Sequence, residues 1–249
     1  MNKLCVYTVV CGNYDKVNEV VQTRDDVDYI CFTDTNYKGS VPQCWKHIVI
    51  KQGSLNGSRL NRYLKINIPD EVREYKYSIY VDGNIVVKSI PKVFFDSCLN
   101  GHEIALYEHY ERENIYAESN VCIEKGMDYY WRFRKQIGRY NRNGFVSTSL
   151  YEANIIFRKH NEKTYNAMRF WWDEYSSGVK RDQISFVYSM VFHKINITSL
   201  GRSDVRFEKK YFDIKHHDYP KKYLLKKKVT KFINFICSAV FGEINNGKD

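Results

Sequence analysis

Asp82 and Asn84 are the residues whose type and spacing point most directly to chemistry. They stand in the segment YSIYVDGNIVV, residues 77–87, near the end of an apolar run, with only Gly83 between them. Carboxylate and amide oxygens suit Mg²⁺ or Mn²⁺, which keep several waters and take phosphate oxygens as further ligands. Asp-Gly-Asn after a strand is also a good turn in its own right, and this is the simpler alternative.

Other polar groups follow two further apolar runs in the same way. One set comes directly after residues 4–10, and Asp34 closes the run around residues 28–32. Because ligands of open α/β sheets bind beyond the carboxyl ends of the strands, we expect these groups and Asp82 to converge. They could hold a nucleoside through its base and ribose. The first set consists of Gly12, Asn13, Tyr14 and Asp15.

Three basic residues precede the Asp82 run on a segment with helical periodicity. Arg59, Arg62 and Lys65 fall within an arc of about 120° on one side of this helix. They could offset phosphate charge, although a basic helical face can also be simply solvated. One carboxylate and one amide hold a divalent ion weakly, so we expect metal and a nucleotide diphosphate to bind together.

The elements that must position these groups alternate in type along the chain. Alternating strands and helices predict an α/β fold with a largely parallel sheet flanked by helices. No repeat or Pro/Gly linker interrupts residues 1–215, which are predicted to form one domain, followed by a tail at 216–249. The expected strands are 4–10, 28–32, 45–51, 77–81, 103–107 and 151–158, and the expected helices are 58–68, about 115–140, 161–175 and 182–193.

The C-terminal segment is basic and amphipathic. Residues 202–231 hold 11 Lys and Arg against 4 Asp and Glu, out of a net charge of +10. Apolar residues recur at three- and four-residue steps through 223–241, with lysines between them. The apolar part is too short to span a bilayer, so residues 222–241 are predicted to lie on an anionic membrane surface. The alternative is a helix packed on its own domain.

Composition and the absence of certain motifs narrow the expected compartment and the expected kinds of ligand. The seven cysteines form no CxxC pair, and the first ten residues show no signal region, so we expect a cytoplasmic protein with reduced thiols. The excess positive charge lacks the interleaved aromatic pattern of RNA modules, so no nucleic-acid partner is expected. The sequence also shows no P-loop and no GxGxxG.

Seven motifs in a fixed order resemble a known family. The motifs are VYTVVCGNYD (6–15), YICFTD (29–34), SRLNRYLKI (58–66), YSIYVDGN (77–84), HYER (109–112), LYEANIIFRKHN (150–161) and WWDEYSSGVKRDQISF (171–186). Their order resembles the glycosyltransferase family that includes bacterial polysaccharide enzymes and the catalytic domain of plant pectin- and mucilage-related transferases, and more distantly the glycogenin-like branch of the GT-A fold. The resemblance runs over roughly residues 4–195.

This resemblance implies a GT-A fold, a UDP-sugar donor and a divalent metal. Asp82 and Asn84 match the DxD position, although the Asn departs from the strict motif. A late His ligand is common in such enzymes, and His217, or its neighbour His216, could serve; a surface turn is the alternative. The residues expected near the diphosphate or the sugars are His109, Arg112, Asn154, Arg181 and Gln183.

The resemblance also implies the reaction. An inverting transfer needs a carboxylate base, for which Asp182 is the first candidate and Glu152 the second. In a retaining transfer the leaving phosphate can itself take the proton. Asp182 could instead only cap a helix, and Glu152 and Asn154 could be the polar face of a strand.

The expected acceptor is a saccharide or lipid-linked saccharide of bacterial O-antigen or capsule synthesis, handled at the inner face of the cytoplasmic membrane. Two alternatives stay open. One is a nucleotide-sugar hydrolase or nucleotidyltransferase using the same metal and nucleotide. The other is a non-enzymatic basic module that binds membrane or nucleic acid.

Overall fold

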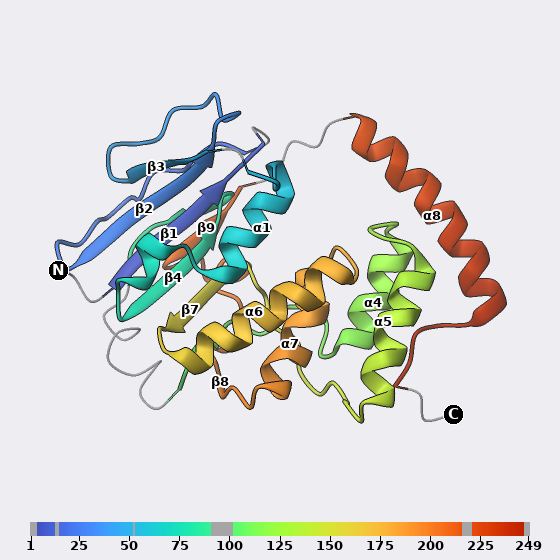
Figure 1. Ribbon diagram of the computed structural model, residues 1–249. Coiled ribbons are helices and arrows are strands. Elements are labelled where there is room, and N and C mark those ends of the chain that lie inside the picture. The colour runs from blue at the N-terminus through green and yellow to red at the C-terminus, as the bar shows by residue number, and fades with distance from the viewer. Residues whose placement is uncertain (1–3, 13–14, 52, 91–101, 216–220, 247–249) are drawn as a thin grey trace. The chain divides into compact units, whose positions relative to one another are not determined.

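The computed structural model describes residues 4–12, 15–51, 53–90, 102–215 and 221–246. The chain forms two compact units (Figure 1). Unit 1 contains Met1–Tyr110, Glu152–Arg169 and Ile195–Asp218, and unit 2 contains Glu111–Tyr151, Phe170–Lys194 and Tyr219–Asp249.

Unit 1 is built on a mixed sheet, which in the described residues has seven strands. Four of the neighbouring pairs are parallel and two are antiparallel, which confirms the predicted α/β fold with a mostly parallel sheet. Across the sheet the strands run in the order β3 (Lys46–Ile50), β2 (Val27–Asp34), β1 (Leu4–Val10), β4 (Tyr77–Asp82), β7 (Ile155–Lys159), β6 (Ile104–Leu106) and β8 (Ile197–Ser199).

The central strand β1 explains why the N-terminal apolar run is so continuous. All seven of its residues are buried, and it pairs in parallel with β2 on one side and β4 on the other. A parallel strand covered on both faces reads as an unbroken apolar run, here LCVYTVV. The prediction of a buried strand at residues 4–10 is confirmed.

The register of these strands aligns their carboxyl ends. Val10 lies opposite Thr33 of β2, and Val9 lies opposite Asp82 at the end of β4. The residues that follow β1 and β2 therefore meet the end of β4 at one edge of the sheet. The expected convergence of these strand ends is present.

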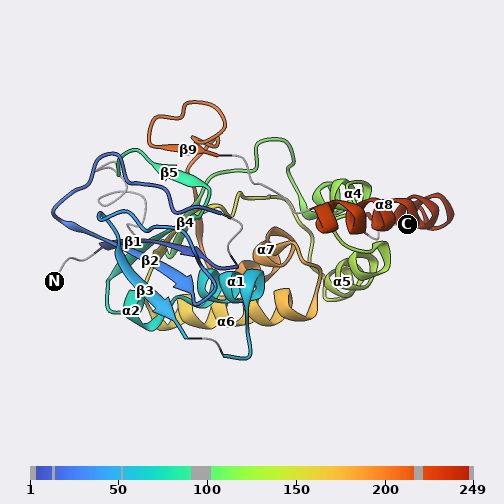
Figure 2. The same cartoon turned by 90° about the horizontal axis from the view of Figure 1, so that it is seen from above.

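Two layers cover the sheet of unit 1. The helices α1 (Gly57–Asn67) and α2 (Asp70–Arg73) lie on one face, and α1 contacts β1. The two-stranded sheet formed by β5 (Ile85–Val87) and β9 (Phe212–Ile214) lies on the opposite face, as Figure 2 shows. The β5–β9 pair was not predicted, because three-residue strands leave too short a pattern to detect.

Unit 2 is helical. Its helices pack through aromatic and ionic contacts: Tyr140 and Tyr188 stack with ring centroids 3.8 Å apart, and Glu174 accepts hydrogen bonds from Arg139 and Tyr140. None of the helices in the described part of the chain is long and apolar enough to cross a bilayer. The helices are α4 (Ile115–Glu124), α5 (Tyr130–Arg142), α7 (Asp182–Phe192), α8 (Lys221–Phe241) and the second half of α6 (Glu162–Ser177).

One element differs from its prediction in a way that matters for the site. The strand expected over 151–158 begins only at Ile155, and it runs antiparallel to β4. Asn154 therefore lies in the turn before β7, and Glu152 lies in the irregular segment just ahead of that turn, so neither is on a strand edge. Apolar residues at 153, 155 and 156 made the turn look like part of the strand. Backbone hydrogen bonds of this segment are made with Tyr107 and Asp82, which are distant in sequence.

Candidate functional site

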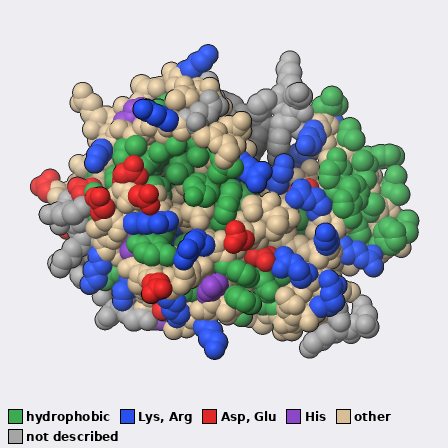
Figure 3. All heavy atoms as spheres, in the orientation of Figure 1, with side chains coloured by type: hydrophobic (Ala, Val, Ile, Leu, Met, Phe, Trp, Pro, Cys, Tyr) green, Lys and Arg blue, Asp and Glu red, His purple; other side chains and the backbone are tan. Residues whose placement is uncertain are grey.

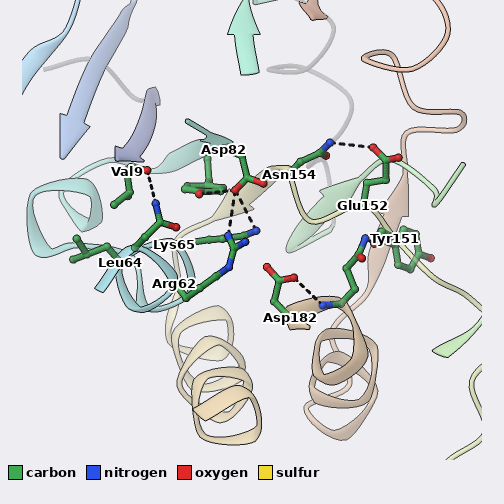
Figure 4. Close-up of polar contacts among 12 residues, drawn as sticks. Val9, Arg62, Leu64, Lys65, Asp82, Tyr151, Glu152, Asn154 and Asp182 are labelled. Atoms are coloured by element: carbon green, nitrogen blue, oxygen red, sulfur yellow. Dashed lines mark hydrogen bonds and ion pairs between the residues drawn. The ribbon is translucent and has the colours of Figure 1, made fainter. Parts of the chain in front are cut away.

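The Asp82 carboxylate lies at the carboxyl end of β4, where three side chains contact one of its oxygens. The Tyr80 hydroxyl donates to Oδ1 at 2.7 Å, Lys65 Nζ lies at 3.4 Å and Arg62 Nη1 at 3.5 Å. Figure 4 shows Arg62 and Lys65 reaching this oxygen from α1. Two cationic groups thus offset a single carboxylate.

Burial distinguishes the basic residues of α1 from an ordinary solvated face. Lys65 is only 1% exposed, Arg62 is half-buried, and Arg59 one turn earlier is exposed. A buried ammonium is costly unless an opposite charge lies close by, so Asp82 and Lys65 depend on each other. The prediction that basic residues of this helix face the Asp82 site holds for Arg62 and Lys65, whereas Arg59 is placed in solvent.

Tyr80 is a site residue that the sequence analysis missed. Side chains two residues apart share one face of a strand, so Tyr80 and Asp82 point the same way. That spacing could have identified it. Gly83 is also constrained, because an added Cβ there would lie 2.8 Å from Val10 Cγ2 and 3.7 Å from Asp15 Oδ2. Asp15, expected in the donor site, is therefore close to the turn after β4.

The ends of β1 and β2 are joined by a side chain. The Gly12 amide donates to Asp34 Oδ2 at 3.0 Å, and Gly12 has a positive φ of 81°, which favours glycine. Asp34 is 2% exposed, and its other oxygen has no partner among the described residues. A buried acceptor without a partner is a position where a ligand hydroxyl or N–H could bind. Asn13 and Tyr14 lie outside the described residues.

A cysteine beside this contact is not a nucleophile. Burial, and next the negative charge of Asp34, raise the pKa of the Cys11 thiol to about 12. The thiol is therefore protonated at neutral pH and chemically inert. The cysteines in the described residues are free, as the sequence predicted.

Asn84 is tied to the strand β9. Its Nδ2 donates to the Lys215 carbonyl at 3.0 Å, and its own carbonyl accepts from the Lys215 amide at 2.9 Å. With the amide nitrogen committed to this bond, Oδ1 is the atom of Asn84 that could contact a cation. His217, and with it His216, falls outside the described residues, immediately after Lys215.

Glu152 is the centre of a second polar cluster in unit 1. It is 3% exposed and accepts hydrogen bonds from Ser203 Oγ at 2.7 Å, Asn154 Nδ2 at 3.1 Å and Arg206 Nε at 3.4 Å. Ser203 and Arg206 were not predicted, because nothing in their local sequence marks them. The Asp82 amide donates to the Asn154 carbonyl at 2.8 Å, so this cluster adjoins the end of β4.

Two features of the Glu152 cluster suit a polyhydroxylated ligand. Asn154 Oδ1 is buried and has no partner among the described residues. The Arg206 guanidinium also lies over the Tyr110 ring at 4.7 Å, and Tyr110 stacks with His109, whose ring centroid is 5.2 Å away. His109 and Asn154, both predicted sugar-site residues, therefore belong to one connected set with Glu152.

The remaining predicted residues belong to unit 2. Asp182 is the first residue of α7 and not its N-cap, which is Arg181, and its Oδ1 accepts from the adjacent Gln183 amide at 3.1 Å. Gln183 Nε2 donates to the Tyr151 carbonyl at 2.8 Å, and its Oε1 is buried without a partner among the described residues. The Asp182 carbonyl accepts from Trp171 at 3.0 Å.

Arg112 and Arg181 share one carboxylate. Both guanidinium groups donate to Glu118, which is 1% exposed and lies on α4. Arg181 Nε is 2.7 Å from Glu118 Oε1. These contacts give both arginines a structural partner that the sequence did not reveal. They also place Arg112 and Arg181 together in unit 2, as neither motif alone could predict.

The donor set at the end of β4 fits a hard divalent cation under one condition. Asp82 and Asn84 offer oxygen ligands, but no group of three or more His, Cys, Asp or Glu side chains in the described residues could hold a metal. Because Lys65 and Arg62 already offset the charge of Asp82, a cation would bind here only with a ligand that brings its own negative charge. A diphosphate meets that condition.

The fold and these residues define an α/β domain with a candidate ligand site at one edge of its sheet. Acidic, amide and basic groups meet at the carboxyl ends of parallel strands, where α/β domains bind their ligands. Residues 3–217 match the family of the TOD1/MUCI70 glycosyltransferase-like domain, and the chain belongs to this family. The match confirms the family that the seven motifs indicated. The curated proteins contain no match to this chain.

Proposed function

We propose that this protein is a metal-dependent glycosyltransferase that moves a hexose from a UDP-sugar to a saccharide or lipid-linked saccharide. Membership of the glycosyltransferase-like family supports the transfer of a sugar. One observation carries the donor part: a carboxylate at the end of β4, with Lys65 and Arg62 on it and Asn84 two residues away. This is the charge pattern that a metal-bound diphosphate would complete.

The donor would lie along the ends of the three parallel strands. Asp34, with its unpartnered Oδ1, and the backbone at Gly12 would hold the nucleoside. Arg62 and Lys65 would offset charge on the departing diphosphate, because fixed cations stabilise charge that develops during the reaction. Lys65 is well suited to this role, since its burial keeps water from screening its charge.

Asp82 and Asn84 would hold Mn²⁺ or Mg²⁺, which when bound supplies charge stabilisation at the leaving UDP. His217 is the proposed third ligand.

Asp182 and Glu152 would have different roles. Glu152 already accepts from three donors, which favours holding a sugar over removing a proton, so we assign it to positioning. Asp182 is the proposed base if the reaction inverts the anomeric carbon. From the resemblance we also propose that the acceptor belongs to bacterial surface polysaccharide synthesis and that the protein works in the cytoplasm, at the inner face of the membrane.

The donor is tested by a panel of UDP-sugars, scored for release of UDP with and without Mn²⁺. We expect metal-dependent release with at least one hexose donor, increased by an added saccharide acceptor. Release that no acceptor increases would instead favour a nucleotide-sugar hydrolase. Melting temperatures measured with UDP, with Mn²⁺ and with both should show a joint shift larger than the sum of the two; a response to neither would contradict the proposal.

The two carboxylates are distinguished by kinetics. Asp182→Asn should lower kcat roughly 100-fold with little change in KM, as expected for loss of a general base. Glu152→Gln should act mainly on KM for the donor or acceptor sugar. Asp173→Asn, an exposed Asp of α6, is the matched control and should leave both constants unchanged. Equal effects of the Asp182 and control variants would remove Asp182 from the mechanism.

A further inference from the structure

The stripe of α8 that packs against the other helices of unit 2 is polar. Thr230 and Asn234 are 3% and 1% exposed. Asn234 Nδ2 donates to the carbonyls of Ile123 and Asp128, both at 2.9 Å, and its Oδ1 accepts from the Tyr130 amide at 2.8 Å. Hydrogen bonds, not an apolar stripe, therefore seat this helix.

The opposite face of α8 is apolar and exposed, which inverts the usual arrangement of a surface helix. At about 100° per residue, Leu225, Phe232 and Ile236 lie within about 20° of the direction opposite Asn234. Figure 3 shows the hydrophobic side chains gathered over this helix. The outer face, as we call it, consists of Leu225, Val229, Phe232, Phe235, Ile236 and Val240, which are between 49% and 72% exposed.

Lysines border the outer face. By the same helical period, Lys231 lies on one flank and Lys226 on the other, between the packed stripe and the apolar residues, whereas Lys228 lies between Phe232 and Phe235. The sequence of α8 contains no Asp or Glu. The face is therefore apolar in its middle and positively charged along its sides.

The helix is held firmly by unit 2. An added Cβ at Gly126, whose φ is +65°, would lie 2.4 Å from the Lys227 carbonyl oxygen, so the backbone of α8 crosses close to the end of α4. Beyond its C-terminal end, Ile244 and Asn120 exchange two hydrogen bonds of 2.9 and 3.0 Å. These contacts fix which side of α8 is presented outward.

We infer that the outer face of α8 docks flat on an anionic lipid surface. The helix is 21 residues long, about 31 Å, and it lacks the apolar length to cross a bilayer, so it would lie in the interface. Phe232 and Phe235 would enter the acyl boundary while the flanking lysines contact anionic headgroups. A second copy of the chain fits this face less well. In a two-fold contact the lysines would face α8 of the second copy, which has no carboxylate to pair with them.

The test is co-sedimentation of the full chain with vesicles of 60% phosphatidylcholine and 40% phosphatidylglycerol, compared with phosphatidylcholine alone. Phe232→Gln/Phe235→Gln should weaken binding to the anionic vesicles at least tenfold. Lys226→Gln/Lys228→Gln/Lys231→Gln should do the same and remove the salt dependence. The matched control Val21→Gln/Phe207→Gln replaces two exposed apolar residues outside α8 and should change binding less than twofold.

Two results would overturn the inference: wild-type protein that stays in solution with anionic vesicles, or Phe232→Gln/Phe235→Gln protein that binds as wild type does. Light scattering without lipid tests the alternative occupant of the outer face, a second copy of the chain. A dimer abolished by the phenylalanine variant, together with absent vesicle binding, would assign the outer face to self-association. Docking requires neither a UDP-sugar nor a metal, so its failure would leave the proposed function standing.

Discussion

The end of β4 and the helix α8 depart from ordinary burial in opposite directions. At β4 a lysine is buried against a carboxylate, whereas on α8 Thr230 and Asn234 are buried and the six apolar residues of the outer face are exposed. Neither arrangement is the cheapest way to fold a chain, because buried charge and exposed apolar area both cost free energy. Each region is better explained by what it would bind: an anionic diphosphate at one and a lipid surface at the other.

The largest effect should come from Asp82. Asp82→Asn keeps the shape of the side chain but removes its charge, and we expect UDP release to fall at least about 1,000-fold, as when a main charge-stabilising group is removed. The joint shift of melting temperature with UDP and Mn²⁺ should also disappear. Asp70→Asn makes the same change at an exposed position on α2 and serves as control. Full activity of Asp82→Asn would end the proposed role of the β4 site.

The dependence of Lys65 on Asp82 can be measured as stability. Asp82→Asn should lower the free energy of unfolding by about 2–3 kcal/mol, because it removes the charge of a carboxylate that lies 3.4 Å from the buried Lys65 ammonium. Adding Lys65→Met should recover about half of that loss without restoring activity. Urea unfolding of the two variants measures both values. If the double variant were less stable than the single one, the two residues would not be coupled in this way.

The two faces of α8 should differ in the same measurement. Asn234→Ala removes a side chain that makes three buried hydrogen bonds, and we expect a loss of about 2 kcal/mol. Phe235→Gln, on the outer face, should change the free energy of unfolding by less than about 0.5 kcal/mol. The reverse order of the two effects would mean that the outer face is covered within the protein itself.

The smallest effect concerns a partly buried histidine that is unrelated to either ligand. Burial, and next the charge of Arg158, lower the pKa of His160 to about 4, and its Nε2 lies 2.8 Å from Ser78 Oγ. Since the unfolded chain takes up a proton near pH 6.5 and the folded chain only near pH 4, stability should fall between those values as the pH falls. We expect a loss of about 1 kcal/mol from pH 6.5 to 5.5.

His160→Gln checks the assignment of this pH dependence. The variant removes the titrating ring, so the difference in unfolding free energy between pH 6.5 and 5.5 should shrink by about the same amount. His47→Gln is the control, since that residue is exposed on the edge strand β3. A variant with the wild-type pH profile would assign the loss to other groups.

Local patterns of the chain were sufficient for most of the longer strands and helices and for the sheet edge where the candidate site lies. The strand at residues 4–10 was predicted with its exact limits, and the helix over 58–68 differs by one residue at each end. Asp34 and Asp82 could be assigned to one edge because parallel strands align their carboxyl ends. Such conclusions need only the periodicity of side chains and the chemistry of turns.

The partners of the site residues could not be read in the same way. Glu152 is held by Ser203 and Arg206, about 50 positions away, and Arg181 by Glu118, 63 positions away. A hydrogen bond between distant residues leaves no periodic trace in the sequence. The sequence alone therefore identified Glu152 and Arg181 as candidate site residues without showing which partners position them.

By itself the sequence determined the family, which polar residues follow the strands, and the amphipathic pattern of residues 223–241. Only the tertiary structure decided that Lys65 is buried, that Glu152 is held by distant partners, and that α8 packs by Thr230 and Asn234 with its apolar face outward. The physical reason is that a repeating pattern tells which residues share a face of an element. Which face is covered depends on the elements that the rest of the chain brings against it.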